Sequence, residues 1–129
     1  MQIDVVTFCA SVVSHPNGFD ILGVPSGAGI LEVAKTPELS VVIVARPSDA
    51  DDIPRICRFT ITHDDGQLIF GREFAVPPHP RDDTQYCHMH QSTFPTNQFL
   101  QTGWHRLELY VDGVQSHSVP LMVYLPDQT

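Results

Sequence analysis

The sequence predicts an all-β protein with an immunoglobulin-like, two-sheet antiparallel β-sandwich of seven to nine strands. Short segments in which apolar and polar residues alternate recur along the chain, with turn residues between them at spacings of about 8 to 12 residues. No segment has helical apolar periodicity over more than about two turns. Eleven prolines are spread along the chain at intervals that break helices.

The N-terminal half contains five of the expected strands. The stretch from Leu39 to Ala45 is nearly all apolar, which predicts a central strand that is buried on both faces or capped by a loop. In the next strand Cys57, Phe59 and Ile61 alternate with polar residues and are expected to point inward. The five segments cover residues 3–14, 20–24, 30–34, 39–45 and 55–63.

The second half continues the pattern after the turn residues Asp64-Asp65-Gly66. Residues 67–76 are expected to return antiparallel to the preceding strand, and residues 86–92 to form another strand. Residues 92–102 are expected to form a loop that covers one open end of the sandwich. The last two expected strands, residues 103–111 and 119–125, form a hairpin around Asp112-Gly113.

The hairpin needs one extra residue. With a two-residue turn, Leu107 would face Ser118 and the apolar residues of the last strand would fall on the polar face. Either a three-residue loop with Gly113 in the left-handed conformation, pairing Leu107 with His117, or a bulge between Gln115 and Ser118 restores the alternation. Pro120 donates no ladder hydrogen bond, which predicts a sheet edge or a bulge at that point.

Length and composition predict a single domain over residues 1–129, large enough for a core without metal or disulfide staples. No apolar run approaches the roughly 18 to 20 residues that a membrane span needs, so no membrane is expected as a partner. Three cysteines, an odd number, indicate reduced thiols and a cytoplasmic location.

The charge balance limits the partners. Seven basic residues against fifteen acidic ones give a net charge of −8, without a local cluster of Lys or Arg. Nucleic acid is therefore not expected, because binding to phosphate polymers depends on cationic side chains. A basic protein partner fits this charge.

The densest group of metal-ligand residue types is Cys87-His88-Met89-His90. On a strand, His88 and His90 share one face and can bind zinc or copper, with further ligands from His79, His105 or Asp82. The alternative interpretation leaves both histidines solvated and packs Cys87 and Met89 in the core.

The chain lacks the patterns of nucleophilic catalysis. It contains no Gly-x-Ser-x-Gly elbow, and no Cys or Ser stands in a recognisable signature with a base. The sequence therefore predicts no catalytic residue and a protein that is not an enzyme.

Four residues are candidates for an interaction surface, because the alternation places them on the outer face of the last hairpin: Trp104, Tyr110, Met122 and Tyr124. Such side chains are enriched in the cores of protein interfaces. Another part of the same chain could equally cover them. Alternatively, Trp104 and Tyr110 bind a small ligand or a carbohydrate.

Three segments of the chain form a recognisable pattern: Asp20-Ile21-Leu22-Gly23-Val24, residues 39–45, and the closing pattern Gly103-x-His105-x-Leu107-x-Leu109-x-Val111-Asp112-Gly113 with Ser118-Val119-Pro120-Leu121-x-Val123. Through these segments the chain resembles a family of small bacterial single-domain β-sandwich proteins of unknown function. The resemblance implies an immunoglobulin-like sandwich without an assigned activity, and it carries no site residue over to this chain. The Cys87 to His90 cluster is not part of this pattern.

These observations predict a non-enzymatic module for protein interaction or assembly, which presents a sheet face or edge to a protein partner or to a second copy of itself. A metal-binding protein that uses Cys87, His88 and His90 is the first alternative. A small-ligand or carbohydrate-binding module is the second.

Overall fold

The structure is a computed structural model that describes residues 1–16, 18–22, 30–48, 53–78 and 87–126. These residues form ten strands and two 3-10 helices, one strand more than the upper limit expected from the sequence. In chain order the elements are β1 (Gln2–Cys9), β2 (Ser11–His15), β3 (Gly18–Leu22), β4 (Ile30–Glu32), η1 (Val33–Lys35), β5 (Glu38–Arg46), β6 (Arg55–His63), β7 (Leu68–Val76), β8 (His88–Pro95), η2 (Thr96–Gln98), β9 (Gly103–Val111) and β10 (Val114–Tyr124).

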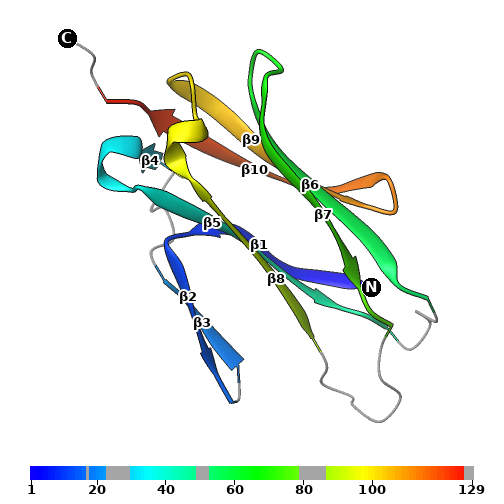
Figure 1. Cartoon of the computed structure of the whole chain (residues 1–129). Helices are drawn as coiled ribbons and strands as arrows, with labels where there is room; N and C mark the ends of the chain where they lie inside the picture. The colour runs from blue at the N-terminus through cyan, green and yellow to red at the C-terminus, as the bar shows by residue number, and fades with distance from the viewer. Residues whose placement is uncertain (17, 23–29, 49–52, 79–86, 127–129) are drawn as a thin grey trace.

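Two sheets form the two layers of the sandwich (Figure 1). One has three strands in the order β1-β5-β8, and the other has five in the order β4-β10-β9-β6-β7. Neighbouring strands pair antiparallel except β4 and β10, which are parallel. The predicted all-β, immunoglobulin-like sandwich is confirmed.

The main core lies between the two sheets and is built from the inward residues of each strand. Cys57, Phe59 and Ile61 of β6 are each 0% exposed, as their alternation predicts. β9 contributes Leu107 and Leu109 to the same layer. The period-two pattern of the sequence therefore identifies the inner face of the five-stranded sheet correctly.

A second, smaller apolar cluster lies on the other face of the three-stranded sheet. Val42 and Val44 of β5 are buried there with Cys9, and Val12 and Ile21 of the β2–β3 hairpin pack against them. Figure 1 shows this hairpin extending from the side of the three-stranded sheet. The predicted burial of residues 39–45 on both faces is confirmed, because one face meets the main core and the hairpin covers the other.

The prediction of a single strand over residues 3–14 is wrong. The chain leaves the three-stranded sheet after Cys9, and Ser11–His15 pairs with β3 in a separate two-stranded sheet. The break has a physical reason, since the second segment must leave β5 in order to place Val12 over Val42 and Val44.

Residues 92–102 are more regular than the sequence indicates. β8 continues to Pro95 and is followed by η2, where the Thr96 backbone N–H donates to Pro37 O at 3.0 Å. Phe94 and Phe99 are buried, and their ring centroids lie 5.8 Å apart. The segment thus closes part of the core with two phenylalanine rings.

In the last hairpin the extra residue lies in a bulge after the turn, which is the second of the two predicted alternatives. Asp112 and Gly113 have φ angles of 49° and 82°, a two-residue turn between the paired Val111 and Val114. The extra residue is a bulge between Gln115 and His117, so the three-residue loop is wrong.

The bulge changes the pairing expected for His117. This residue faces Leu109 and is exposed, while Leu107 pairs with Val119. The left-handed conformation of Asp112 is held by its carboxylate, which accepts from the Ile56 backbone N–H at 3.0 Å and from Arg55 at 2.8 Å.

The edge predicted at Pro120 is confirmed. β4 pairs only with Met122–Tyr124, so among the described residues β10 has a single neighbouring strand, β9, at Pro120. The missing N–H of proline is tolerated at such an edge.

Phe59→Ala should lower the free energy of unfolding by about 3–5 kcal/mol, because it opens a cavity beside a ring that is 0% exposed. Leu68→Ala, at an apolar residue 61% exposed on the neighbouring strand, should stay within about 0.5 kcal/mol of the wild type. Urea denaturation followed by circular dichroism measures both. Equal losses in the two variants would contradict the assigned core.

Candidate interaction surface

Four side chains form an apolar patch on the outer face of the five-stranded sheet. Ile30 of β4, Met122 of β10 and Trp104 of β9 lie in register across three neighbouring strands. Tyr124 follows Met122 on the same face of β10. We call these four residues the outer patch.

Three of the four side chains of the outer patch are exposed. Ile30, Trp104 and Tyr124 are 47%, 41% and 46% exposed, and Met122 is half-buried between its neighbours. Single exposed apolar residues are ordinary, whereas a contiguous group that includes Trp and Tyr is typical of protein interfaces. Within the described residues, no other segment buries these three side chains.

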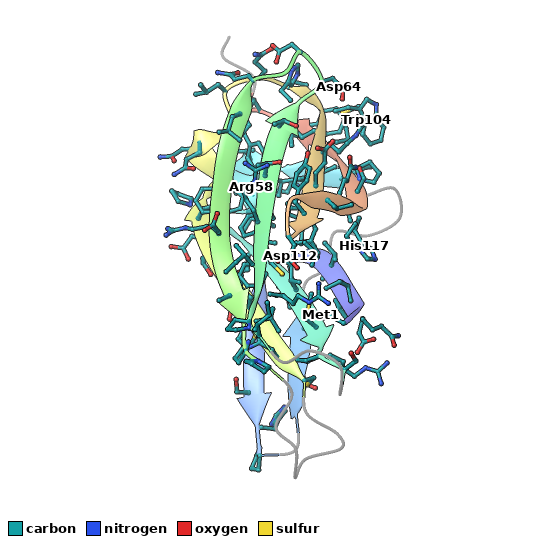
Figure 2. All side chains as sticks on the ribbon, turned by 90° about the vertical axis from the view of Figure 1, so that its right-hand side faces the viewer. Met1, Arg58, Asp64, Trp104, Asp112 and His117 are labelled. Atoms are coloured by element: carbon teal, nitrogen blue, oxygen red, sulfur yellow. The ribbon has the colours of Figure 1, made fainter. Side chains whose placement is uncertain are left out.

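Tyr110, the fourth interaction candidate of the sequence, does not belong to the outer patch. It lies six residues from Trp104 on the same strand, about 20 Å away at the rise of a β-strand. Its hydroxyl donates to Glu108 Oε2 at 2.6 Å, and the Arg58 guanidinium lies 4.9 Å from its ring centroid. Figure 2 shows Arg58 in the middle of the sheet and Trp104 at one end.

Tyr110 is therefore part of a polar network on the sheet. The hydrogen bond to Glu108 raises the pKa of the Tyr110 hydroxyl, because it stabilises the protonated phenol beside a carboxylate. Arg106 lies 4.0 Å from the same Glu108 side chain and extends the network. The structure thus separates Tyr110 from Trp104 by charged residues.

Ile30 is the member of the outer patch that sequence reasoning missed. The sequence does indicate a strand at residues 30–34, but nothing in it indicates that this strand pairs with β10. The structure shows Leu31 buried and Ile30 and Glu32 exposed, but the sequence Ile30-Leu31 is apolar at both positions and so does not indicate which of the two faces outward.

Carboxylates border the outer patch. Glu32 is the register partner of Tyr124, and its Oε2 lies 3.0 Å from Lys35 Nζ. At the other side the Asp64 backbone N–H donates to Trp104 O at 3.1 Å, and Figure 2 shows both residues at the same end of the sandwich.

The turn that follows Asp64 adds a second fixed negative charge. The Asp65 carboxylate accepts from the Gln67 backbone N–H at 2.9 Å and from the Gln101 amide at 2.8 Å. These two hydrogen bonds lower the pKa of Asp65 to about 2. The Asp65 side chain is therefore ionised at neutral pH.

The predicted metal-ligand cluster is arranged differently from either interpretation of the sequence. His88 and His90 share a face, as expected, but this face turns toward β7, where the His90 ring stacks on Phe74 with centroids 3.9 Å apart. Met89 packs in the smaller apolar cluster. Cys87 is exposed, so the prediction that it packs in the core is wrong. The prediction that both histidines are solvated is also wrong, because both are half-buried.

No metal centre is evident around these residues. In the part of the chain that the structure describes, no three His, Cys, Asp or Glu side chains lie close enough together to hold a metal ion. His90 Nε2 is 2.7 Å from Ser92 Oγ. His79 and Asp82 lie outside the described residues, and the zinc or copper site at Cys87, His88 and His90 stays a prediction.

His105, the remaining ligand candidate, is a core residue. It is 1% exposed, its Nδ1 lies 2.9 Å from Gly103 O, and its ring makes edge contacts with His63 and Phe99. A carbonyl oxygen only accepts, so Nδ1 carries the proton in the neutral ring. Its Nε2 is buried, with no hydrogen-bond partner among the described residues.

No protein-family model matches the sequence, and no curated protein matches it. Among solved structures, the chain is similar to the alkylpurine DNA glycosylase AlkC of Pseudomonas fluorescens, with 12% identity and a TM-score of 0.49 over 77% of this chain. The chain spans only 28% of the length of that glycosylase.

A second similar structure is an immunoglobulin-like protein from Pseudomonas aeruginosa, with 10% identity and a TM-score of 0.47. The match covers 96% of this chain and 98% of that protein. At such identities the likeness is one of fold alone. No helix in the described part of the chain is long and apolar enough to cross a membrane.

The pH dependence of stability should report the buried histidine. Burial lowers the pKa of His105 from 6.5, so the unfolded chain binds more protons than the folded one below that pH. The stability that the neutral His105 contributes is complete above pH 6.5 and is lost as the pH falls. The free energy of unfolding then changes by at most about 1.4 kcal/mol per pH unit through this group.

His105→Phe should reduce this slope between pH 6.5 and 5 relative to the wild type. Part of the slope remains, because burial also lowers the pKa of His88 and of His90. Urea denaturation at pH 7.5, 6.5, 5.8 and 5.0 measures both proteins. An unchanged slope in the variant would show that His105 is not buried in its neutral form.

Proposed function

We propose that the protein is a non-enzymatic interaction module that binds a protein partner with the outer patch. One observation carries the proposal: Ile30, Trp104 and Tyr124 are each more than 40% exposed and lie around Met122 on one face of the three adjacent strands β4, β10 and β9. Tryptophan and tyrosine supply a large share of binding energy at protein interfaces because they bury much apolar area and lose few rotamers.

The charge of the chain favours a basic partner over a second copy of the same chain. The net charge is −8, Glu32 is the register partner of Tyr124, and the backbone of Asp64 is hydrogen-bonded to that of Trp104. Two copies docked through this patch would bring like charges together, which slows association and costs affinity. A partner with cationic residues around an apolar centre matches both features.

Two further inferences concern context. The described cysteines Cys9, Cys57 and Cys87 are free thiols, which fits a reducing cytoplasm. Burial raises the pKa of Cys57 to about 11, so this thiol is an inert core residue rather than a nucleophile. We place the protein in the bacterial cytoplasm, in a family of small single-domain β-sandwich proteins.

The alternative of a carbohydrate or small-ligand site formed jointly by Trp104 and Tyr110 is less well supported. The two rings are about 20 Å apart along β9, and Arg106 and Glu108 lie between them. A single sugar ring cannot contact both.

Trp104→Ala should weaken partner binding by about tenfold or more, because tryptophan at the centre of an interface is a frequent hot spot. The partner is first captured with the untagged wild-type protein from a lysate of the source organism and purified. Isothermal titration calorimetry then compares the two proteins. Since Trp104 is the only tryptophan in the chain, a blue shift of its fluorescence on binding provides a second readout.

Leu68→Ala is the matched control, because it truncates an apolar side chain 61% exposed on the same sheet but outside the outer patch. It should bind like the wild type. Equal affinity in Trp104→Ala and the wild type would refute the proposal. A dimer in native mass spectrometry that Trp104→Ala dissociates would instead make the partner a second copy of this chain.

A further inference from the structure

An open hollow lies beside the outer patch, where β4 runs into η1 and β10 ends. Its volume is about 460 Å³, and its lining consists of Glu32, Ala34, Tyr124, Leu125 and Pro126. This volume falls within the range of about 300–1,000 Å³ that is typical of ligand sites. Tyr124 belongs to both the hollow and the outer patch, so one partner can occupy the two together.

The lining combines an aromatic ring and a carboxylate. Tyr124 and Glu32 are register partners on β10 and β4, so their side chains project from the same face as neighbours. A tyrosine ring attracts a cation through its quadrupole, and a carboxylate attracts it through charge and hydrogen bonds. The other lining residues are apolar and suit the methylene stem of a long side chain.

The Glu32 carboxylate already attracts a cation of its own chain. Lys35 Nζ lies 3.0 Å from Glu32 Oε2, in a pair whose side chains are 76% and 50% exposed. Exposed pairs of this kind are weak, so Lys35 can yield to another cation. The Glu32 side chain is half exposed, so a second donor can reach its carboxylate.

We propose that this hollow receives an arginine side chain of the protein partner. The inference rests on the proposed function, since the arginine would come from the segment that covers the outer patch. A guanidinium stacks flat on a tyrosine ring and donates hydrogen bonds to a carboxylate, which the compact ammonium of lysine does less well. The net charge of −8 and the carboxylates at the border attract such a segment.

The test uses N-acetyl-arginine amide as the probe and N-acetyl-citrulline amide, its neutral isostere, as the control ligand. Each is titrated into the full-length 15N-labelled protein while amide chemical shifts are recorded. The arginine compound should give saturable shifts at Glu32, Ala34, Tyr124 and Leu125, in the millimolar range expected for one side chain. Citrulline amide should not shift these resonances.

Two variants test the assigned chemistry. Glu32→Gln removes the charge and Tyr124→Leu removes the ring, and each should weaken binding of the arginine compound about fivefold or more. Glu38→Gln, at an exposed carboxylate at the start of β5, should bind it like the wild type. All substitutions are at exposed residues, and the spectrum of each variant reports whether it is folded.

The inference is overturned if the arginine compound gives no saturable shifts at the lining residues, if citrulline amide binds equally well, or if Glu32→Gln binds like the wild type. Partner binding by Trp104→Ala is scored separately. If the partner depends on Trp104 but the arginine compound does not bind, only the arginine pocket is refuted. If the arginine compound binds but Trp104→Ala does not weaken partner binding, the proposed function is refuted.

Discussion

The burial of β5 on both faces is the constraint on which the rest of the structure depends. Its seven residues from Leu39 to Ala45 are all buried, so the strand needs cover from two sides. Each valine or isoleucine left in water would forfeit about 1.5–3 kcal/mol. The five-stranded sheet covers one side, and the β2–β3 hairpin covers Val42 and Val44 on the other.

This arrangement decides which surface faces the surroundings. The hairpin packs on the outer face of the three-stranded sheet, whereas the outer face of the five-stranded sheet carries exposed side chains. That face is divided along β9. Arg58, Glu108 and Tyr110 form a polar network on one part, and the outer patch occupies the end of the sheet near Trp104. The short parallel pairing of β4 completes the patch with Ile30.

Histidine rings serve as packing elements in this sandwich. His90 stacks on Phe74, and His105 contacts Phe99 and His63 through ring edges. A neutral imidazole is flat and partly apolar, so it packs beside phenylalanine as long as it does not take a proton. Burial lowers the pKa of both rings and so favours this neutral form. Two of the histidines that stand out in the sequence as metal-ligand types, His90 and His105, are thus packed against phenylalanine rings.

Local alternation by itself determined much of this protein. The strand at residues 55–63, the inward positions of Cys57, Phe59 and Ile61, and the outward positions of Trp104 and Tyr124 follow from it, because successive side chains on a strand point to opposite faces. The same rule requires an extra residue in the last hairpin, and the sequence already limits its place to the turn or to the strand after it.

Only the tertiary structure decided which strands pair and where the extra residue sits. The break after Cys9, the parallel pairing of β4 with β10 and the bulge between Gln115 and His117 depend on neighbours distant in the chain. The hollow beside Tyr124 follows from the pairing of β4 with β10, whereas the separation of Tyr110 from Trp104 follows from their six-residue spacing on one strand. Period-two patterning specifies the face of a residue but not the neighbouring strand, because many partners satisfy the same alternation and packing selects one of them.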